Sequence, residues 1–308
     1  MEQNSLTVYV IILNWNNFDD TDKCIHSLLE IKDERIKVVI VDNHSTDNSA
    51  QLLKEKYSHL PILVTSTNNG YAGGMNIGIK YALDNSANYI IISNNDIIYP
   101  KDFLPPLLEI INSDLSIGII SPKVLYMHDK NKIYCAGADF KLLRGSGVAA
   151  FQGKNTSKFG NEIREISMAE GSCFLARKEV FLKSGLFCED FFMYFEDLEF
   201  SDRVRENYKI FFTPKSIVYH KGGAGSNWKN HSPLYYYYYT RNRYLYFKKY
   251  KLSVKIYVLF YSLFVSLAKG ITLIKEFILD KNSRQKYMLC LNSLIRGNSD
   301  GIKIFFKK

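Results

Sequence analysis

Short apolar runs alternate with amphipathic stretches along the first hundred residues. The stretches between the runs place apolar side chains three or four positions apart, which is the spacing of one helix face. Strands separated by helices in this way favour a parallel sheet with helices on both faces. The sequence therefore predicts an α/β fold built on a mostly parallel sheet. The expected strands are Val8–Leu13, Val38–Val41, Ile62–Thr65 and Tyr89–Ile92, and a Gly-rich turn and helix are expected over 68–83.

The alternation weakens from Ile117 onward. Residues 126–165 are rich in Gly, Asn and Lys and have no clear period, so we expect an irregular, exposed insertion or hairpin. A regular pattern returns at Ala169–Leu175 and continues through a helix that starts at Arg177. These changes divide the chain into three expected parts, which are 1–125, 126–240 and 241–308.

The third part contains a short run that is typical of a membrane-associated helix. Ile256–Ala268 is thirteen uncharged residues long and is bounded by Lys255 and Lys269. A spanning helix needs about 20 apolar residues, so this run is too short unless it continues to Ile274. We expect a helix that lies in the plane of the membrane interface, with a buried helix of the globular body as the alternative.

Composition changes this picture little. A chain of 308 residues with 46% hydrophobic and 23% charged residues can bury a full core, which excludes a disordered, collagen-like or small disulfide-stapled protein. The five cysteines are scattered and form no C-x-x-C pair, so we expect a reducing, cytosolic compartment. The polar start of the chain predicts no signal peptide.

Charge is distributed very unevenly along the chain. Residues 241–308 hold 15 basic and 3 acidic side chains, a net charge of +12, although the whole chain carries only +9. The body is therefore slightly acidic and the tail strongly basic. This distribution argues against nucleic acid as a partner and favours an anionic membrane surface.

Polar clusters follow four of the expected strands, where a parallel α/β sheet binds its ligands. The Trp15 ring is suited to stacking on a nucleobase, and Asp42 to accepting hydrogen bonds from a base or ribose. Glycines after the third strand would let the backbone approach phosphates near a helix start. Taken singly, these residues have simpler explanations as core, cap and turn residues. The clusters are Asn14-Trp15-Asn16, Asp42-Asn43, Asn68-Asn69-Gly70 and Asn94-Asn95-Asp96, and the glycines are Gly70, Gly73, Gly74 and Gly78.

Asp96 and His220 are the candidate metal ligands. Asp96 should emerge just past a buried strand, and one carboxylate with diphosphate oxygens and waters is a normal shell for a hard divalent ion. His220 follows the strand-like Ser216–Tyr219 and precedes two glycines. An imidazole ligand favours Mn²⁺ over Mg²⁺. The alternatives are an ordinary turn and a structural histidine.

Three carboxylates occur within four positions, at Glu196, Asp197 and Glu199, beside several aromatic residues. Burial and mutual repulsion disfavour ionisation of such acids, and this suits a general base. On a helix, Glu196 and Asp197 would point about 100° apart, so only one would face a given crevice. The alternative is a helix start whose dipole favours acids, with Glu199 and Arg203 as an ordinary i,i+4 pair.

The order of these motifs resembles the family 2 glycosyltransferases, which have the GT-A fold. The resemblance covers roughly residues 6–250 and is greatest to the bacterial rhamnosyltransferase-like and galactofuranosyltransferase-like branch. It implies a nucleotide-sugar-binding half at 1–125 and an acceptor-binding, catalytic half at 126–240. The matching segments are 8–16, 41–47 (VDNHSTD), 69–78 (NGYAGGMNIG), 94–96, 171–181, 192–203 and 220–223.

The resemblance implies a role for each candidate residue. Asp197 would be the catalytic base with Glu196 beside it, Asp96 the ligand of a divalent cation (Mn or Mg), and His220 an accessory ligand. One departure matters, because the usual first aspartate of the Asp-x-Asp metal motif is Asn94 here. The metal would therefore depend on a single carboxylate. The implied donor-binding residues are Asn14, Trp15, Asn16, Asp42, Gly70, Asn76, Asn94 and Asn95.

The expected activity is inverting transfer of a sugar, such as rhamnose or a related hexose, from a nucleotide-diphosphate donor. The acceptor would be a saccharide, lipid-linked if the tail holds the protein at the cytoplasmic face of the cell membrane, in cell-surface polysaccharide synthesis. Two alternatives stay open, a nucleotidyltransferase and a catalytically weak or silent scaffold of a polysaccharide assembly complex. The first needs a basic residue in the loop 14–17, which has none, and the acid pair argues against the second. A Rossmann dehydrogenase is excluded because no G-x-G-x-x-G follows the first strand.

Overall fold

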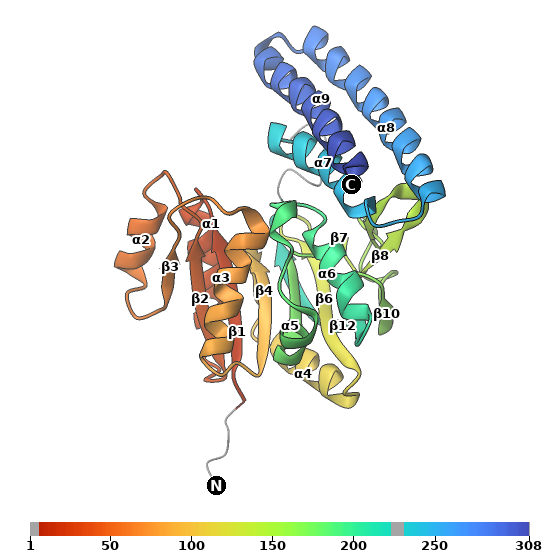
Figure 1. Cartoon of the computed structure of the whole chain (residues 1–308). Helices are drawn as coiled ribbons and strands as arrows, with labels where there is room; N and C mark the ends of the chain where they lie inside the picture. The colour runs from red at the N-terminus through yellow and green to blue at the C-terminus, as the bar shows by residue number, and fades with distance from the viewer. Residues whose placement is uncertain (1–5, 223–230, 308) are drawn as a thin grey trace. The chain divides into compact units, whose positions relative to one another are not determined.

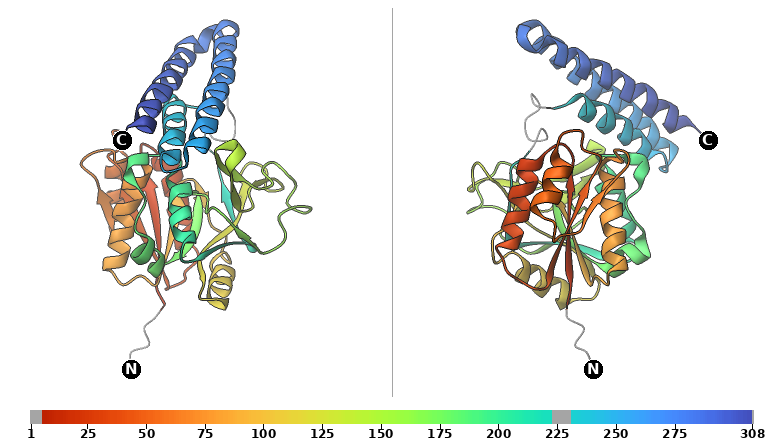
Figure 2. Two further views of the ribbon diagram at one scale, coloured as in Figure 1. Left: turned by 45° about the vertical axis from the view of Figure 1, so that its right-hand side comes forward. Right: turned by 90° about the vertical axis from the view of Figure 1, so that its left-hand side faces the viewer.

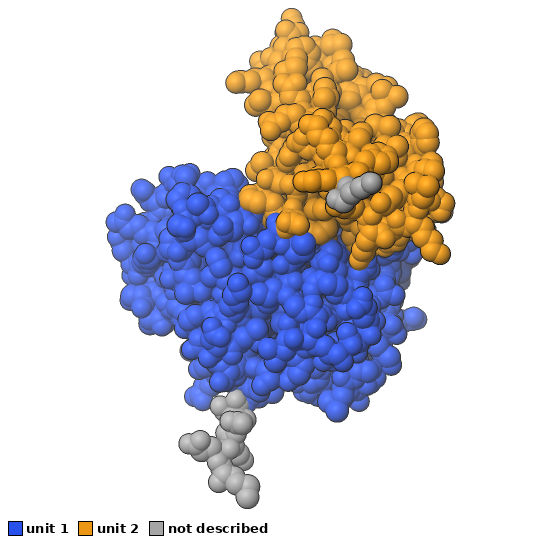
Figure 3. Space-filling view, viewed as in Figure 1, with its two compact units in different colours: residues 1–141, 147–189, 196–222 blue, residues 142–146, 190–195, 223–308 orange. Residues whose placement is uncertain are grey.

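The computed structural model describes residues 6–222 and 231–307, which form two compact units (Figures 1 and 3). The first unit comprises residues 1–141, 147–189 and 196–222, and the second comprises 142–146, 190–195 and 223–308. Gly223, the last residue of the segment 220–223, lies outside the described residues. Each unit is built from segments that are distant in the sequence.

The first unit is organised around a ten-stranded sheet with the main order β10-β12-β6-β11-β4-β1-β2-β3. Neighbours among β4, β1, β2 and β3 are parallel, as are β12 and β6, whereas β11 runs antiparallel between β4 and β6. The strands are β1 (Val8–Asn14), β2 (Ile36–Asp42), β3 (Ile62–Val64), β4 (Tyr89–Asn94), β5 (Ile97–Ile98), β6 (Ile117–Tyr126), β7 (Ile133–Cys135), β10 (Arg164–Ile166), β11 (Cys173–Arg177) and β12 (Lys209–His220). The predicted mostly parallel sheet is confirmed.

Helices cover both faces of this sheet, with α1 and α3 on opposite sides (Figure 2). The strands between them are buried on both faces, which explains why they read as continuous apolar runs in the sequence. The helices of the first unit are α1 (Phe18–Leu29), α2 (Ser49–Lys56), α3 (Gly70–Asp84), α4 (Leu104–Ser113), α5 (Lys178–Ser184) and α6 (Glu196–Arg205).

Two glycines of α3 serve close packing against the sheet. A Cβ atom on Gly74 would lie 2.4 Å from Leu13 Cδ1, and one on Gly78 would lie 2.3 Å from Ile11 Cγ2. The sequence suggested a phosphate-facing role for these glycines. Their missing side chains let α3 approach β1 closely, and an approach of this backbone to phosphates stays a prediction.

Residues 126–165 contain ordered strands as well as irregular segments, so the expectation of an irregular, exposed insertion or hairpin was correct only in part. Residues 126–165 include β7, which pairs with β6, and a separate two-stranded sheet of β8 (Ala138–Lys141) and β9 (Ser146–Ala149). The fully buried strand β6 was also missed. Its middle carries Pro122 and Lys123, which interrupt the apolar pattern. Lys123 is nevertheless buried, because its ammonium group donates to the Asn161 side chain (2.8 Å) and the Thr156 carbonyl (3.2 Å).

The second unit is mainly helical, with α7 (Pro233–Phe247), α8 (Leu252–Leu279) and α9 (Arg284–Phe306). It also contains the 3₁₀ turns Leu142–Arg144 and Lys281–Ser283, and most of the turn Glu189–Phe191. α9 packs tightly on α7, because a Cβ on Gly301 would lie 2.3 Å from the Tyr244 ring and one on Gly297 only 2.6 Å from the Tyr237 carbonyl. The predicted helical tail is confirmed.

α8 is longer than the predicted apolar run, because Lys269 does not interrupt its outer face. The Lys269 ammonium group points inward and lies 5.0, 5.8 and 5.1 Å from the ring centres of Tyr235, Tyr236 and Tyr239. Burial and the charge of Arg243 lower the pKa of Lys269 to about 8. The outer face keeps one exposed apolar stripe, which we call the α8 stripe. It consists of Leu252, Ile256, Phe260, Leu263, Phe264, Leu267, Ile271, Ile274 and Ile278.

By length and composition, α8 is able to cross a membrane. Its most apolar 18-residue window has a mean hydropathy of 1.7, and 17% of that window is buried. Within the described residues, α8 is the one helix that meets this criterion. The criterion is also met by helices of soluble proteins, so it is weak support for a membrane role.

Candidate active site

The polar ends of β1, β2 and β4 meet at one edge of the sheet. Asn14 of β1 lies opposite Asp42 of β2, and Leu13 lies opposite Asn94 of β4. Three of the strand-end clusters expected from the sequence are therefore neighbours in the structure. This edge is the carboxyl end of the parallel strands, where α/β proteins bind their ligands.

Hydrogen bonds join these strand ends into a rigid network. Asp42 is completely buried, and its Oδ2 accepts from Asn14 Nδ2 (2.7 Å) and from the Ser45 hydroxyl (2.7 Å). The Thr21 hydroxyl donates to Asn14 Oδ1 (2.7 Å) and accepts from Asn95 Nδ2 (2.8 Å). In this structure Asp42 and Asn14 hold the edge in place, and their direct contact with a donor stays a prediction.

Trp15 stands out from this network into solvent. Its side chain is 44% exposed, so it is not a core residue. The next residue, Asn16, has a positive φ of 52°, and its Oδ1 accepts from the backbone N–H groups of Thr46 (2.7 Å) and Asp47 (3.3 Å). These bonds hold the loop so that the indole lies at the surface beside the sheet edge. Its position leaves a ring face available for stacking.

The remaining predicted donor residues have well-defined surroundings. The Gly70 carbonyl accepts from Asn43 Nδ2 (2.8 Å), with Gly70 itself at φ 68°. Asn76 is buried and exchanges hydrogen bonds with the Phe187 backbone (2.9 and 3.0 Å) while donating to Glu189 (2.9 Å). Asn94 is partly exposed at the end of β4. Asn76 therefore ties α3 to the 187–189 segment, and its role toward a donor is untested.

Asp96 and His220 come together from distant parts of the chain. β5 pairs with the end of β12, and this pairing brings His220 Nε2 to 2.9 Å from Asp96 Oδ1. Burial disfavours the charged imidazole, but the hydrogen bond and the charge of Asp96 outweigh it and raise the pKa of His220. His220 Nδ1 is buried and has no hydrogen-bond partner within the described part of the chain.

This pair fits a divalent cation that is shared with a phosphorylated ligand. One carboxylate and one imidazole are suitable donors for Mn²⁺, and phosphate oxygens with waters complete such shells. In the range 6–222 and 231–307, no cluster of three or more His, Cys, Asp or Glu side chains is placed to hold a metal. Asp96 and His220 are therefore the pair that would hold a cation here, and its binding stays a prediction.

The two acids Glu196 and Asp197 open helix α6. Glu196 is only 6% exposed, and its Oε2 is one of the buried oxygens without a partner among the described residues. Asp197 is partly buried and accepts from the backbone N–H groups of Gly171 (3.1 Å) and Leu198 (2.8 Å). Burial, followed by the charge of Glu170, raises the pKa of Asp197 to about 7. Burial and Asp197 itself raise the pKa of Glu196.

Glu170 is a third acid of this group that sequence reasoning missed. It is partly buried, and the Ser172 hydroxyl and N–H group donate to its carboxylate. Nearby, the Tyr71 hydroxyl donates to the Gly171 carbonyl. The sequence feature that could have identified Glu170 is its position directly before Gly171 in an otherwise apolar segment. Glu199, in contrast, is a partner of Arg203 (2.8 Å), as the simpler interpretation expected.

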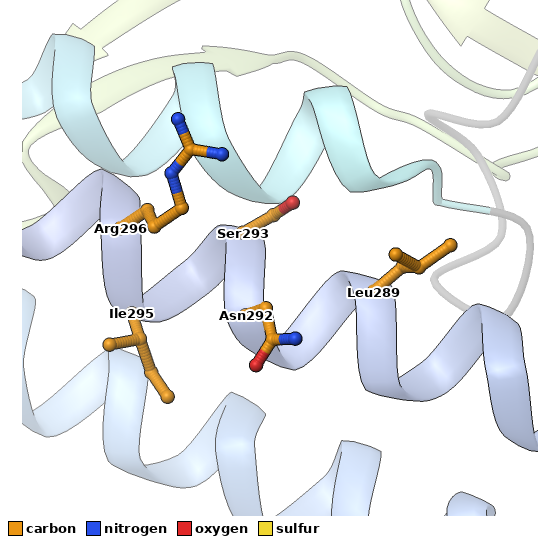
Figure 4. A pocket seen from close by; sticks show the side chains of 5 residues that line it. All are labelled: Leu289, Asn292, Ser293, Ile295 and Arg296. Carbon is orange, nitrogen blue, oxygen red and sulfur yellow. The ribbon is translucent and has the colours of Figure 1, made fainter.

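A separate hollow of about 390 Å³ lies on α9 in the second unit (Figure 4). Its lining contains no carboxylate, histidine or cysteine, so it has none of the groups needed for acid–base or metal chemistry. The candidate active site therefore consists of the sheet edge, the Asp96–His220 pair and the three acids. The hollow is lined by Leu289, Asn292, Ser293, Ile295 and Arg296.

Among curated proteins, similar chains are sugar transferases. The low-salt glycan biosynthesis hexosyltransferase of Haloferax volcanii is 29% identical, over 65% of this chain and 62% of its own length. The N-acetylglucosaminyl-diphospho-decaprenol L-rhamnosyltransferase of Mycobacterium tuberculosis is 23% identical, over 68% of this chain and 75% of its own. The dTDP-rhamnosyl transferase of Shigella flexneri is 26% identical, over 79% and 80%. The match thus spans less than two thirds of the Haloferax protein.

Solved structures of similar shape confirm the expected GT-A-type fold. A mannosyltransferase from Pyrobaculum calidifontis, in complex with GDP-Man and Mn²⁺, has a TM-score of 0.55 at 14% identity, over 98% of this chain and 87% of its own. S. aureus TarS 1-349 in complex with UDP-GlcNAc has a TM-score of 0.55 at 16% identity, over 97% and 82%. At this identity the likeness concerns the fold alone.

The family itself follows from the sequence match. The profile of Glycosyl transferase family 2 matches residues 9–185, which is more than half of the chain. This range contains the sheet edge, Asp96 and Glu170. The chain belongs to glycosyl transferase family 2.

Proposed function

We propose that this protein is an inverting glycosyltransferase that moves rhamnose or a related hexose from a nucleotide-diphosphate donor to a saccharide acceptor. The observation that carries the proposal is Asp197, a partly buried carboxylate whose pKa is raised to about 7 within a family of glycosyltransferases. A base with this pKa is matched to proton abstraction near neutral pH. The Mycobacterium and Shigella relatives are named as rhamnosyltransferases, which supports rhamnose as the first sugar to test.

In the proposed reaction, Asp197 accepts the proton of an acceptor hydroxyl. The acceptor oxygen attacks the anomeric carbon from the face opposite the leaving group, and a new C–O bond forms. The bond from the anomeric carbon to the diphosphate breaks, and its electron pair leaves with the diphosphate oxygen. A single displacement of this kind inverts the anomeric configuration and needs no covalent enzyme intermediate. The raised pKa of Glu196 favours its protonated form, which keeps a second negative charge away from Asp197.

We assign donor binding to residues 1–125. Trp15 would stack on the base. The hydrogen-bonded sheet edge of Asn14, Asp42 and Asn95 would hold the loop that carries Trp15 in place. Asn16, Gly70, Asn76 and Asn94 are the further donor-binding candidates. Residues 126–240 would contribute the acceptor side with Glu196 and Asp197, and the tail 241–308 the membrane contact.

Asp96 and His220 are the residues that would hold a divalent cation, either Mn²⁺ or Mg²⁺. A bound cation supplies positive charge to the departing diphosphate. The Asp96 carboxylate is 15% exposed and is therefore accessible to a ligand. The Pyrobaculum mannosyltransferase, whose structure is a complex with GDP-Man and Mn²⁺, supports a divalent cation and makes Mn²⁺ the first ion to test.

A lipid-linked acceptor at the cytoplasmic face of the cell membrane fits the tail best. The α8 stripe exposes apolar side chains along the whole helix, and the tail carries a net charge of +12. An in-plane helix combines both features, since apolar insertion and attraction to anionic lipids act together. The name of the mycobacterial relative includes a decaprenol-linked acceptor, which supports this assignment.

The test is transfer by the purified full chain with dTDP-rhamnose and other nucleotide-sugars, using a short-chain polyprenyl-diphospho-N-acetylglucosamine as acceptor. We expect release of the nucleotide diphosphate and a product of inverted anomeric configuration by NMR. Asp197→Asn should lose about 10²- to 10⁴-fold in rate with donor affinity retained. The matched control is Asp202→Asn, on the same helix. Transfer by Asp197→Asn at the wild-type rate would overturn the assignment of the base.

A further inference from the structure

The chain enters helix α6 through an unusual segment, residues 190–195, which we call the entry segment. Phe192, Tyr194 and Phe195 have φ values of 62°, 67° and 74°, although none is glycine. Bulky residues rarely adopt this left-handed conformation, and they keep it only where surrounding structure holds them. Glu196 and Asp197 follow immediately.

Asn242 of α7 holds the backbone of the entry segment. Its Nδ2 lies 2.7 Å from the Phe191 carbonyl oxygen and 2.8 Å from those of Met193 and Tyr194. Asn242 is completely buried, and its Oδ1 accepts from Arg241 Nε at 2.8 Å. The Arg241 guanidinium also donates to the carbonyls of Asp190 and Phe191. The amide is thereby oriented with its donors toward the segment.

The tyrosines of α7 hold the side chains of the same segment. The Phe192 ring stacks on Tyr238 with centres 4.6 Å apart, and Phe195 contacts Tyr239 edge to face at 5.2 Å. Tyr194 packs edge to face on Tyr235 at 5.4 Å. Three of the five consecutive tyrosines, Tyr235, Tyr238 and Tyr239, therefore form a packing surface for the entry segment. Backbone and side chains are fixed by one face of one helix.

We propose that Asn242 is a positioning residue for the catalytic base, because it fixes the backbone from which Asp197 follows after two peptide bonds. The inference rests on the role of Asp197 proposed above. The entry segment and α7 belong to the same unit, and the peptide bond from Phe195 to Glu196 continues directly into α6. Loss of the Asn242 donors leaves one buried and two partly buried carbonyls without this partner and allows the left-handed residues to relax.

The test compares Asn242→Leu with Asn298→Leu. Leucine matches asparagine in size and adds no charge, but it removes all donors. Asn298 lies on α9 in the same unit, where it bonds Tyr244, Ser266 and the Leu294 carbonyl and does not contact the entry segment. We expect kcat of Asn242→Leu to fall about 10- to 100-fold with the donor KM within about twofold, as for a misplaced catalytic group. Asn298→Leu should keep the wild-type kcat.

A second readout separates positioning from simple loss of stability. The groups that face Asp197 are Glu196 on its own helix, Glu170 and Tyr71. If Asp197 moves away from Glu170 toward water in Asn242→Leu, its pKa falls. The decrease of kcat on the acidic side of the pH profile then begins at a lower pH. A variant that is only less stable has a lower melting temperature, but the acidic side of its kcat pH profile is unchanged. Asn242→Ser, which keeps one donor, should show intermediate kcat.

The outcomes distinguish this inference from the proposed function. An active Asp197→Asn protein means that the base assignment has failed. An inactive Asp197→Asn together with wild-type kcat and an unchanged kcat pH profile in Asn242→Leu overturns the positioning role alone. If Asn242→Leu does not fold, Arg241→Lys keeps the charge but loses the planar donors. It should then show the same loss of kcat to a smaller degree, and a wild-type kcat in this variant would overturn the inference.

Discussion

At the scale of single residues, the main feature of the candidate site is a group of three acids, Glu170, Glu196 and Asp197, which are buried or partly buried. Burial and the charge of Glu170 raise the pKa of Asp197, and burial and the charge of Asp197 raise the pKa of Glu196, so these two carboxyls keep protons that free carboxyls would release. Such an arrangement is useful for proton transfer and unfavourable for folding. Both consequences are measurable.

The first expected consequence is a pH-dependent rate. Asp197 must be ionised to accept a proton, and its pKa is about 7, so kcat of the wild-type protein should fall tenfold per pH unit below about pH 7. The measurement is a kcat profile between pH 5 and 9 with saturating donor. A profile that stays flat down to pH 5 would show that no group of this pKa is needed.

The second consequence concerns stability. The folded-state pKa of Asp197 is about 7 and the unfolded value about 4, so the native state binds the extra proton between these values. The free energy of unfolding therefore falls as pH rises through this window. Asp197→Asn has no ionisable group at this position and therefore does not lose stability in this way. The difference in free energy of unfolding between Asp197→Asn and the wild type should grow, in favour of the variant, from pH 4 to pH 7. Urea titrations measure the difference, with the exposed Glu34→Gln as control. A difference that shrinks with pH would contradict the raised pKa.

Metal binding gives a third residue-scale prediction. Asp96→Ala should weaken binding of the nucleotide diphosphate more in the presence of Mn²⁺ than in its absence, because the carboxylate and the phosphates would share the ion. His220→Ala should show the same pattern more mildly. Calorimetric titrations with and without Mn²⁺ test both variants. Equal losses under the two conditions would remove Asp96 from the metal site.

At the scale of elements, the sequence pattern predicted strands that are buried on both faces. The strands β1, β2 and β4 are buried on both faces, so each is a plain apolar run. β6 escaped prediction because Pro122 and Lys123 interrupt such a run. The ammonium group of Lys123 is accommodated by partners 33 and 38 residues away, which no local pattern reveals.

The contact between α3 and β1 gives a prediction about one glycine. A Cβ on Gly78 would lie 2.3 Å from Ile11 and 3.1 Å from Val41, so Gly78→Ala should destabilise the fold by about 1–3 kcal/mol through overpacking. The control is Gly270→Ala in α8, where the nearest atom is 3.7 Å away. That substitution should stabilise its helix by up to about 1 kcal/mol. Chemical denaturation compares the two, and equal effects would contradict the close approach of α3.

At the scale of the whole molecule, the site is assembled from residues that are far apart in the sequence. The strand-end residues were predictable because parallel strands bring their carboxyl ends to one edge. Asp96 and His220, each singled out from the strand that precedes it, lie together in the structure, and their role as metal ligands stays a prediction. Glu170 was not identified, and the hydrogen bonds of Asn242 to the entry segment could not be foreseen. These interactions join residues 27 and about 50 positions apart, namely Glu170 with Asp197 and Asn242 with the entry segment. Local pattern contains no information on such contacts.

The distribution of charge and apolar surface leads to a prediction about membranes. Phe264→Glu places a charge in the middle of the α8 stripe and should reduce co-sedimentation with anionic vesicles at least tenfold, since it removes apolar burial and adds repulsion. High salt should weaken binding of the wild type without abolishing it. Leu115→Glu is the control, because Leu115 is 79% exposed in the other unit. Equal sedimentation of the two variants would contradict docking through α8.

The discontinuous second unit has a consequence for the order of synthesis. The carbonyls of the entry segment leave the ribosome about 50 residues before Asn242, and Gly145 leaves 98 residues before its partner Arg243. At about 5–20 residues per second, the entry segment waits roughly 3–10 s for its partner. During this time the nascent chain already contains both acids but lacks Asn242, whose amide bonds the segment that precedes them. Chains that end before residue 242 therefore lack the partner of the entry segment, and we expect them to lack activity.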